Sequence, residues 1–352
     1  MIFFQSIQSV LSIIIMIALG YLLKRQGWFD ESFGKSISSL ITRVALPASI
    51  FVSVLKNLTK ESLFQLSGSL IYPVGAVIIS YFLSYGLVKI LKIRPGRRGI
   101  FMNAVVNANT IFIGLPLNIA LFGEKALPYF LVYYVTNTVS TWAFGVFLIS
   151  NDDPTKVKGE TKAKLNWKKL LPPPLLGFIA AIIFLLIGIP VPSFINATLG
   201  YVGSIVTPLS LLYIGIVLYD AGLKSIRFDR DTVVALLGRF VLAPAVLIGL
   251  IALGSNAFGA NLAPLLKQTL IVQSATPMLA VLPILANEAH GDVKYATNLV
   301  TTSTILFVVV VPILMQLVQF IYFASPSKKA FANCECFFLI QMSQLFLYFW
   351  IF

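Results

Sequence analysis

The chain is poor in the residues from which metal centres and histidine-dependent active sites are built. Its 352 residues include two cysteines, Cys334 and Cys336, and one histidine, His290. A structural zinc site takes four such ligands, and a hydrolytic triad needs a histidine beside a nucleophile. Both cysteines lie near the end of the chain and the histidine lies in an expected loop. We therefore expect that the protein binds no metal or cofactor and is not an enzyme.

Charged residues are scarce as well. They make up 11% of the chain, while hydrophobic residues make up 58%, and ordinary soluble domains carry about 25% charge. Apolar stretches of about 20 residues recur along the whole sequence, enough to cross roughly 30 Å of hydrocarbon as helices. The mean hydropathy is +0.91. This composition predicts an all-α polytopic membrane protein.

Carboxylates are missing from the middle of the apolar stretches. Each of the 13 Asp and Glu residues falls in a loop or near the end of a stretch. Proton relays in membrane proteins usually place a carboxylate or a histidine within the bilayer. A proton pathway through a buried carboxylate is therefore not expected.

Ten apolar stretches are long enough to span a bilayer. The polar, lysine-rich segment 150–170 divides them into two sets of five, within residues 1–149 and 171–322, and a tail follows at 323–352. Because five is odd, two similar sets would be inverted relative to each other in the membrane. The expected spans are 5–23, 36–55, 64–88, 99–122, 126–149, 171–189, 197–219, 232–253, 263–287 and 295–322.

The loop charges predict an orientation. Loops after the odd-numbered spans hold 18 Lys and Arg residues, and those on the opposite side hold 6. The positive-inside rule then places the odd loops in the cytoplasm and the N-terminus outside, in the cell membrane. The net charge of +13 does not indicate nucleic-acid binding, because the basic residues are spread over loops rather than grouped on one face.

Two of the spans are interrupted by a short polar segment that contains proline. The interruptions are NANTIFIGLPL (107–117) and VQSATPMLAVLPIL (272–285). A broken helix leaves backbone groups without partners in the bilayer, at several kcal/mol each, unless protein, water or a solute meets them. One such break in each half of a chain is the sequence sign of a secondary transporter with its site near the midplane.

Polar side chains near the breaks are the candidate substrate ligands. The N-terminus of a half-helix carries partial positive charge and suits a carboxylate, and neutral amides and hydroxyls would add donors. The candidate ligands are Asn103, Asn107, Asn109, Thr110, Gln273, Ser274 and Thr276, and the breaks are assigned to Gly114, Pro116, Pro277 and Pro283.

Further residues have two interpretations each. Arg43 and Arg239 fall inside spans 2 and 8, where their side chains either extend to the cytoplasmic surface or attract an anion. Asn137 and Asn298 belong to polar helices that follow the two breaks. They either line the site or join packed helices through hydrogen bonds.

The prolines suggest how the two halves align. Pro47 and Pro208 are separated by 161 positions, and so are Pro116 and Pro277. A rival register pairs Pro116 with Pro283 instead. We prefer the first register because two proline pairs share it.

The sequence resembles the auxin efflux carrier family, which includes plant carriers and bacterial malate or malonate permeases. The resemblance lies in NTIFIGLPL (109–117), in ATPMLAVLPILANEAHGD (275–292) and in the basic central loop, within about residues 1–322. It implies ten helices in two inverted five-helix repeats, with the fourth and ninth helices broken and crossing. It also implies a scaffold, a mobile transport part and an organic-anion substrate. The tail 323–352 departs from the family pattern.

A carrier of small organic anions such as malate or malonate is the first interpretation. Uniport and a coupling cation held by carbonyls and amides are both open, so a sodium-coupled organic-acid symporter is the alternative within transport. A membrane sensor that binds without translocating is the alternative from another class. The expected partners are the anion and the lipid bilayer, with a homodimer left open.

Overall fold

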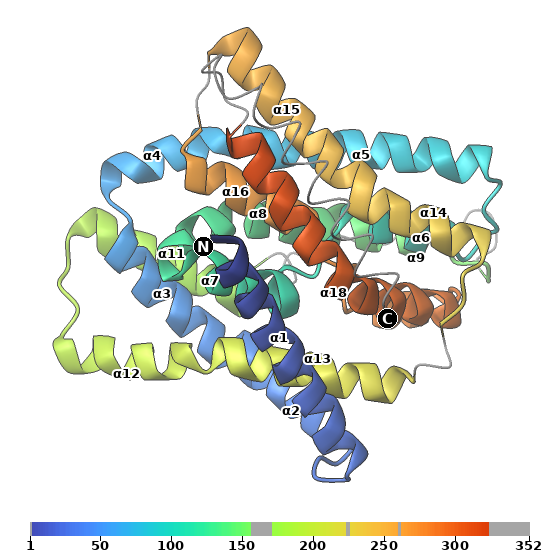
Figure 1. Cartoon of the computed structure of the whole chain (residues 1–352), viewed down its shortest axis with the longest axis horizontal. Coiled ribbons are helices and arrows are strands. Elements are labelled where there is room, and N and C mark those ends of the chain that lie inside the picture. Colours follow the sequence, from blue (N-terminus) through green and yellow to red (C-terminus); the bar gives the residue numbers. More distant parts are fainter. Residues whose placement is uncertain (1, 156–170, 223–225, 260–261, 324–352) are drawn as a thin grey trace.

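The computed structural model describes residues 2–155, 171–222, 226–259 and 262–323. Within these residues the chain is helical and contains no strand; one isolated antiparallel bridge joins Ala108 to Met278. Most of the predicted linker and nearly all of the predicted tail, with both cysteines, lie outside the described residues. Figure 1 shows long helices packed side by side around shorter, interrupted ones.

Helix occupies all ten of the predicted ranges. Several of these ranges contain two or more consecutive elements, joined by a π-helical turn, a one-residue turn or an unwound segment. The α-helices are α1 (Ile2–Arg25), α2 (Phe33–Leu40), α3 (Leu46–Asn57), α4 (Lys60–Ser69), α5 (Ile71–Ile90), α6 (Arg98–Val106), α7 (Leu115–Phe122), α8 (Leu127–Val139), α9 (Val146–Asn151), α11 (Pro173–Ile187), α12 (Ser193–Ser204), α13 (Val206–Ala221), α14 (Arg230–Leu237), α15 (Ala243–Phe258), α16 (Pro264–Ser274), α17 (Leu282–Glu288) and α18 (Val293–Phe323).

Five of the composite helices in the described part of the chain are long and apolar enough to cross a membrane. They are Phe33–Asn57, Lys60–Ile90, Glu124–Asn151, Ser193–Ala221 and Arg230–Ala257. The helices Thr110–Phe122 and Pro173–Ile187 are apolar but shorter. The chain is therefore a polytopic helical membrane protein.

Two pairs of helices from opposite halves of the chain pack closely. Helix α1 lies along α13, and α11 lies along α3. In the first pair, a Cβ on Gly215 would come within 2.1 Å of the carbonyl oxygen of Ile17, and one on Gly20 within 2.3 Å of that of Leu212. Glycine at both positions lets the two backbones touch.

Charged residues from loops far apart in sequence meet at one end of the molecule. Arg97 Nε donates to Asp292 Oδ2 at 2.7 Å, and Arg97 Nη1 donates to Asp229 Oδ2 at 3.1 Å. Asp152 Oδ2 accepts from the Gly99 N–H at 3.1 Å. These residues belong to the loops after the third, fifth, seventh and ninth predicted spans. In Figure 1 this end lies on the right, where α5 ends and α14 begins.

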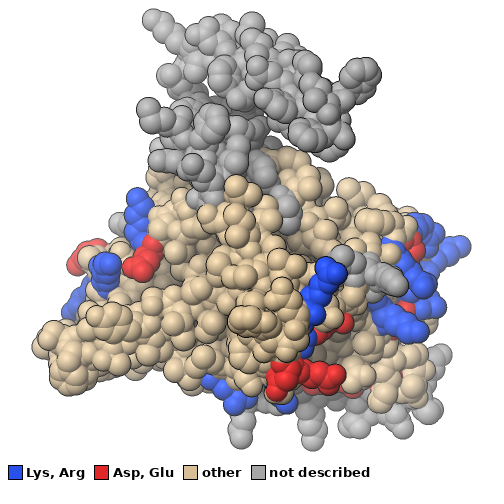
Figure 2. Space-filling view, turned by 60° about the horizontal axis from the view of Figure 1, so that its bottom comes forward, with Lys and Arg blue, Asp and Glu red and all other residues tan. Residues whose placement is uncertain are grey.

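The surface is largely uncharged between its margins. Figure 2 shows a broad area of other residues, with most of the Lys and Arg at the left and right of the view and a few along its lower edge. Large apolar side chains are exposed on several helices, among them Phe82, Ile90, Phe194 and Tyr201, each at least 70% exposed. Such a surface suits contact with lipid rather than water.

The structure corrects the preferred alignment of the two breaks. Pro116 lies inside the continuous helix Thr110–Phe122, as the second residue of α7 after the turn η2 (Thr110–Gly114), whereas Pro283 is the second residue of α17, which begins a new helix. Pro277 instead lies in the unwound segment between α16 and α17. The helices before the two breaks end at Val106 and Ser274, 168 positions apart, so the breaks follow the rival register, which pairs Pro116 with Pro283 at a separation of 167. Proline fits the first turn of α17 because no intrahelical hydrogen bond is lost there.

Candidate functional site: the crossing of two interrupted helices

The two interrupted helices cross at their unwound segments. Helix α6 ends at Val106, and a π-helical turn, η2 (Thr110–Gly114), resumes after three residues. Helix α16 ends at Ser274, and α17 resumes at Leu282. The segments run antiparallel, and the Asn109 N–H donates to the Pro277 carbonyl at 2.8 Å. Each break thus supplies a hydrogen-bond partner for a backbone group of the other.

Asn137 satisfies the first break. Its Oδ1 accepts from the Ala108 N–H at 2.8 Å, and its Nδ2 donates to the Ala108 carbonyl at 3.0 Å. Ala108 is completely buried, so neither backbone group can turn to water. Of the two interpretations, the structure places Asn137 as a hydrogen-bonding joint between α8 and the break.

The second break has different partners. The Met278 N–H donates to Ser303 Oγ on α18 at 3.2 Å. Asn298 lies on the same helix but makes its double contact elsewhere: Oδ1 accepts from the Arg227 N–H, and Nδ2 donates to the Arg227 carbonyl, both at 2.8 Å. Asn298 thus anchors the segment before α14 rather than the break.

Asn103 and Asn107 bond to each other and to their neighbours. Asn107 Nδ2 donates to Asn103 Oδ1 at 2.6 Å and to Tyr81 Oη at 2.9 Å. Asn107 Oδ1 accepts from Ser140 Oγ at 2.6 Å. Both asparagines are completely buried. This network joins α5, α6 and the turn after α8 within the first half.

The candidates of the second half also bond to backbone. Gln273 Nε2 donates to the Gly114 carbonyl at 2.9 Å, across the two halves. Ser274 Oγ donates to the Ile271 carbonyl at 2.7 Å, and Thr276 Oγ1 donates to the Gln273 carbonyl at 2.9 Å. All three side chains are buried, so the geometry assigns them first to repair of the broken backbone.

Arg239 is the residue at the crossing whose role the sequence did not reveal. It lies in the π-helical turn η6 (Gly238–Leu242) and is completely buried. Its guanidinium donates to the carbonyls of Thr276 at 2.9 Å, Val106 at 2.8 Å and Val105 at 3.1 Å, and also to that of Ser274. Extension to the cytoplasmic surface is therefore wrong for this arginine.

A signal for Arg239 was available in the sequence. The residue lies nine positions after the start of α14, about 14 Å along the helix axis, which is deep for a side chain that must reach the surface. Arg43 differs from it. Arg43 is exposed on η1 (Ile41–Ala45), a turn that packs against α11 and α12.

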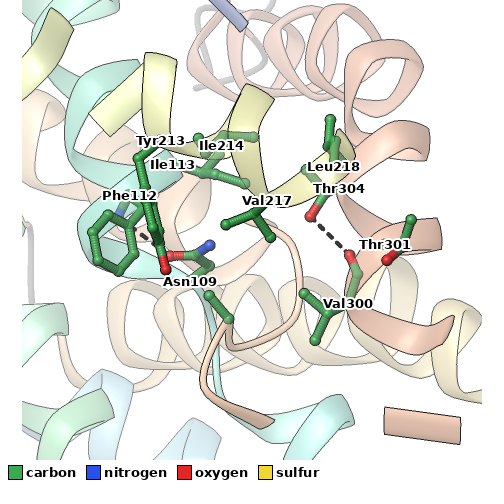
Figure 3. Close-up of a pocket in the computed structure, with 11 residues that line it drawn as sticks. Asn109, Phe112, Ile113, Tyr213, Ile214, Val217, Leu218, Val300, Thr301 and Thr304 are labelled. Atoms are coloured by element: carbon green, nitrogen blue, oxygen red, sulfur yellow. Dashed lines mark hydrogen bonds between the residues drawn. The ribbon is translucent and has the colours of Figure 1, made fainter. Parts of the chain in front are cut away.

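A pocket lies beside the crossing, where the interrupted helices face α13 and α18 (Figure 3). Its cavity volume is about 10 Å³, about enough for one water molecule, so the pocket is narrow in this conformation. None of the described residues that line it is charged. The lining residues are Asn109, Phe112, Ile113, Tyr213, Ile214, Val217, Leu218, Ala280, Val300, Thr301 and Thr304.

Asn109 is the one candidate ligand that lines this pocket. Its Oδ1 accepts from the Phe112 N–H at 3.2 Å and so caps η2. In Figure 3 the amide nitrogen points the other way, towards Val217. Thr110 follows as the first, buried residue of η2. Helix α13 contains no polar break or motif, so the sequence did not predict that its residues line the pocket.

Charges outside the apolar region hold the loop end together. Burial acts to raise the pKa of Asp292, but hydrogen bonds from the Tyr295 N–H, Arg97 and Arg94 outweigh it and lower the pKa. Burial also acts to raise the pKa of Asp229, but hydrogen bonds from Thr232 and Arg97 outweigh it and lower the pKa. The Arg97 guanidinium also stacks on Tyr295, 4.3 Å from the ring centroid.

A polytopic helical protein with two interrupted helices crossing beside a pocket is built as a membrane carrier. Comparison with known proteins agrees. The family model described as "Membrane transport protein" matches residues 5–315. The chain belongs to this family, that of the auxin efflux carriers.

The similar proteins are uncharacterized transporters, and the similarity extends over nearly the whole length of each. The chain is 27% identical to the uncharacterized transporter MJ1031 of Methanocaldococcus jannaschii over 309 residues, which cover 86% of this chain and 95% of that one. It is 25% identical to an uncharacterized transporter of Methanothermobacter thermautotrophicus, with 89% and 98% covered. The uncharacterized transporter YfdV of Escherichia coli K12 is 21% identical, with 87% and 96% covered. Their names specify transport and no substrate.

Proposed function

We propose that this chain is a secondary transporter of small organic anions and that the pocket beside Asn109 binds the anion. The observation that carries the proposal is the position of this pocket. It opens between the interrupted helices, which supply Asn109 and Ala280, and α13, which supplies Tyr213 and Val217. A ligand there contacts both halves of the chain at once.

The pocket suits an anion held by neutral donors. Asn109 Nδ2 is the side-chain donor of the broken segment, and η2 begins at the next residue with its N-terminal, partly positive end. The apolar walls would contact the rest of the solute. Malate and malonate are the candidates that the family resemblance suggests.

The helix packing supports two inverted repeats. The pair α1–α13 joins the first helix of one half to the second span of the other, and α11–α3 makes the reciprocal pair. We infer that these helices form the scaffold and that the interrupted helices, with their neighbours, form the moving part. Sliding of one against the other would open the pocket to each side in turn, with the odd loops in the cytoplasm and the N-terminus outside.

The proposal is tested by binding and uptake. Purified protein should show a thermal shift with at least one member of a panel of malate, malonate and indole-acetate, and proteoliposomes should take up the same compound. Asn109→Ala should lose both responses. Asn57→Ala is a matched control, because Asn57 lies at the end of α3 outside the pocket lining. Equal uptake by the Asn109 variant and wild type would contradict the assignment of the pocket.

The two alternatives give different results. A sodium-coupled symporter would lose uptake when sodium is replaced by choline. A sensor would bind the ligand in the thermal assay but fail to accumulate it in proteoliposomes. A homodimer is left as a proposal that cross-linking in the membrane would test.

A further inference from the structure

The guanidinium of Arg239 is enclosed by backbone carbonyls. Its four bonding partners are Val105, Val106, Ser274 and Thr276, and all four oxygens come from the ends of α6 and α16 or from the unwound residues just beyond. The side chain is completely buried and is not among those that line the pocket. Its donors are turned towards the protein and away from any substrate there.

The charge of this enclosure has a simple origin. The C-terminal end of a helix carries about −0.5 elementary charge from its unpaired carbonyls. Helices α6 and α16 both end at the crossing, so about one negative charge gathers there. One guanidinium neutralises it and gives the carbonyls the donors that the broken helices lack.

The same set of ligands is what a small cation would use. In carriers with interrupted helices, unwound carbonyls and the C-terminal ends of half-helices coordinate the coupling Na⁺ or H⁺. Here the Arg239 side chain reaches into that position from η6. Gly238 allows it, because a Cβ there would come within 2.7 Å of the Val105 side chain and would press η6 away from α6.

We propose that Arg239 is a fixed cation occupying a latent cation site at the crossing, and that shortening this side chain opens the site to a small monovalent cation. A consequence, which rests on the proposed transport function, is that wild-type uptake needs neither Na⁺ nor K⁺. The carbonyls that would bind a coupling ion are already occupied by the protein itself.

Chemical rescue tests the site without using transport. Arg239→Ala, purified in detergent, should lose Tm on the order of 5–10 °C, since removal of a buried charged partner is strongly destabilising. Guanidinium chloride at millimolar concentration should restore part of that loss, because it returns the missing group. Urea, which has the same shape without charge, should not. Wild type and Arg43→Ala, which alters the exposed arginine, should respond to neither.

Sodium and potassium chloride at matched ionic strength complete the assay. A specific recovery of Arg239→Ala in either salt would also support the latent site and would name the ion that fits it. Equal Tm values for wild type and the variant, or equal effects of urea and guanidinium, would overturn the proposal.

If Arg239→Ala is not recovered as folded protein, two longer variants decide. Arg239→Lys keeps the charge, and Arg239→Gln keeps polar atoms at a similar reach without charge. The lysine variant should be clearly more stable than the glutamine variant, and equal stability would contradict a need for charge. Uptake by wild type in sodium- and potassium-free choline buffer tests the consequence separately. Ion-dependent uptake with intact guanidinium rescue would overturn that consequence while leaving the transport function standing.

Discussion

Asn137 holds both backbone groups of Ala108, the N–H at 2.8 Å and the carbonyl at 3.0 Å, although the two residues are 29 positions apart. A side-chain amide is the right shape for this task, because it carries one acceptor and one donor side by side. The interaction replaces the two helical hydrogen bonds that the break removes. It ties the interrupted helix to α8 at the centre of the molecule.

Replacement of Asn137 by leucine should therefore destabilise the fold. The buried Ala108 N–H would lose its partner, at a cost of about 1–3 kcal/mol, and the Ala108 carbonyl would keep only the Thr110 N–H at 3.0 Å. Thermal unfolding of the purified protein measures the effect. Asn57→Leu is the control, since the Asn57 amide donates to Ser53 on its own helix, at the end of α3. A loss of Tm as large for Asn57→Leu as for Asn137→Leu would contradict the reasoning.

Substitutions of Gln273 and Asn109 should affect different properties, the first mainly stability and the second mainly ligand binding. Gln273→Ala removes the bond to the Gly114 carbonyl and should lower Tm, because that carbonyl lies in buried backbone. Asn109→Ala removes a hydrogen-bond donor from the pocket. It should weaken ligand binding strongly and lower the Tm of the ligand-free protein only slightly. Both variants are measured by unfolding with and without ligand. Affinity lost equally in the two variants would mean that Gln273 also acts on the substrate.

Gly215 should not tolerate a larger side chain. A leucine there would push α13 away from α1, since even a Cβ would lie 2.1 Å from the Ile17 carbonyl oxygen. We expect Gly215→Leu to reduce the yield of folded protein in detergent, as judged by size-exclusion chromatography. Gly249→Ala is the control: nothing lies within 4 Å of its added Cβ, and the change should be neutral or stabilising by up to about 1 kcal/mol.

Acid should loosen the loop end of the molecule. The pKa values of Asp292 and Asp229 are lowered in the fold, so their contribution is fully present above the ordinary value of about 3.9 and is lost as pH falls through the lowered value. Wild type should lose stability below about pH 4. Asp292→Asn should start from a lower Tm at pH 7 and lose less on acidification. An unchanged acid slope would exclude this carboxylate as a contributor.

Much of the fold could be predicted from local properties. Apolar length placed helices at the ten expected ranges, and proline with polar residues marked the two interruptions at the positions where α6 and α16 end. The alignment of the breaks was wrong, because the spacing of prolines does not show where the helices before the breaks end. Helices α6 and α16 end 168 positions apart, close to the separation of Pro116 and Pro283 and not to that of Pro116 and Pro277.

Less of the candidate site could be predicted. Residue type showed that Asn107, Asn137 and Gln273 lie near the breaks, but not that their amides are bonded to other protein groups. For Arg239 the same limit led to a wrong expectation, since burial depends on what packs around η6. Only the assembled helices show that α13 contributes a wall to the pocket.

The sequence by itself determined that this protein is a helical membrane protein with two interrupted helices, because length, hydropathy and helix breaking are properties of neighbouring residues. The tertiary structure alone decided which groups satisfy the breaks. Arg239 meets Val105 across 134 positions, and Gln273 meets Gly114 across 159. Partners so distant are brought together by packing of whole helices, and in a medium without water each exposed carbonyl must find one of them.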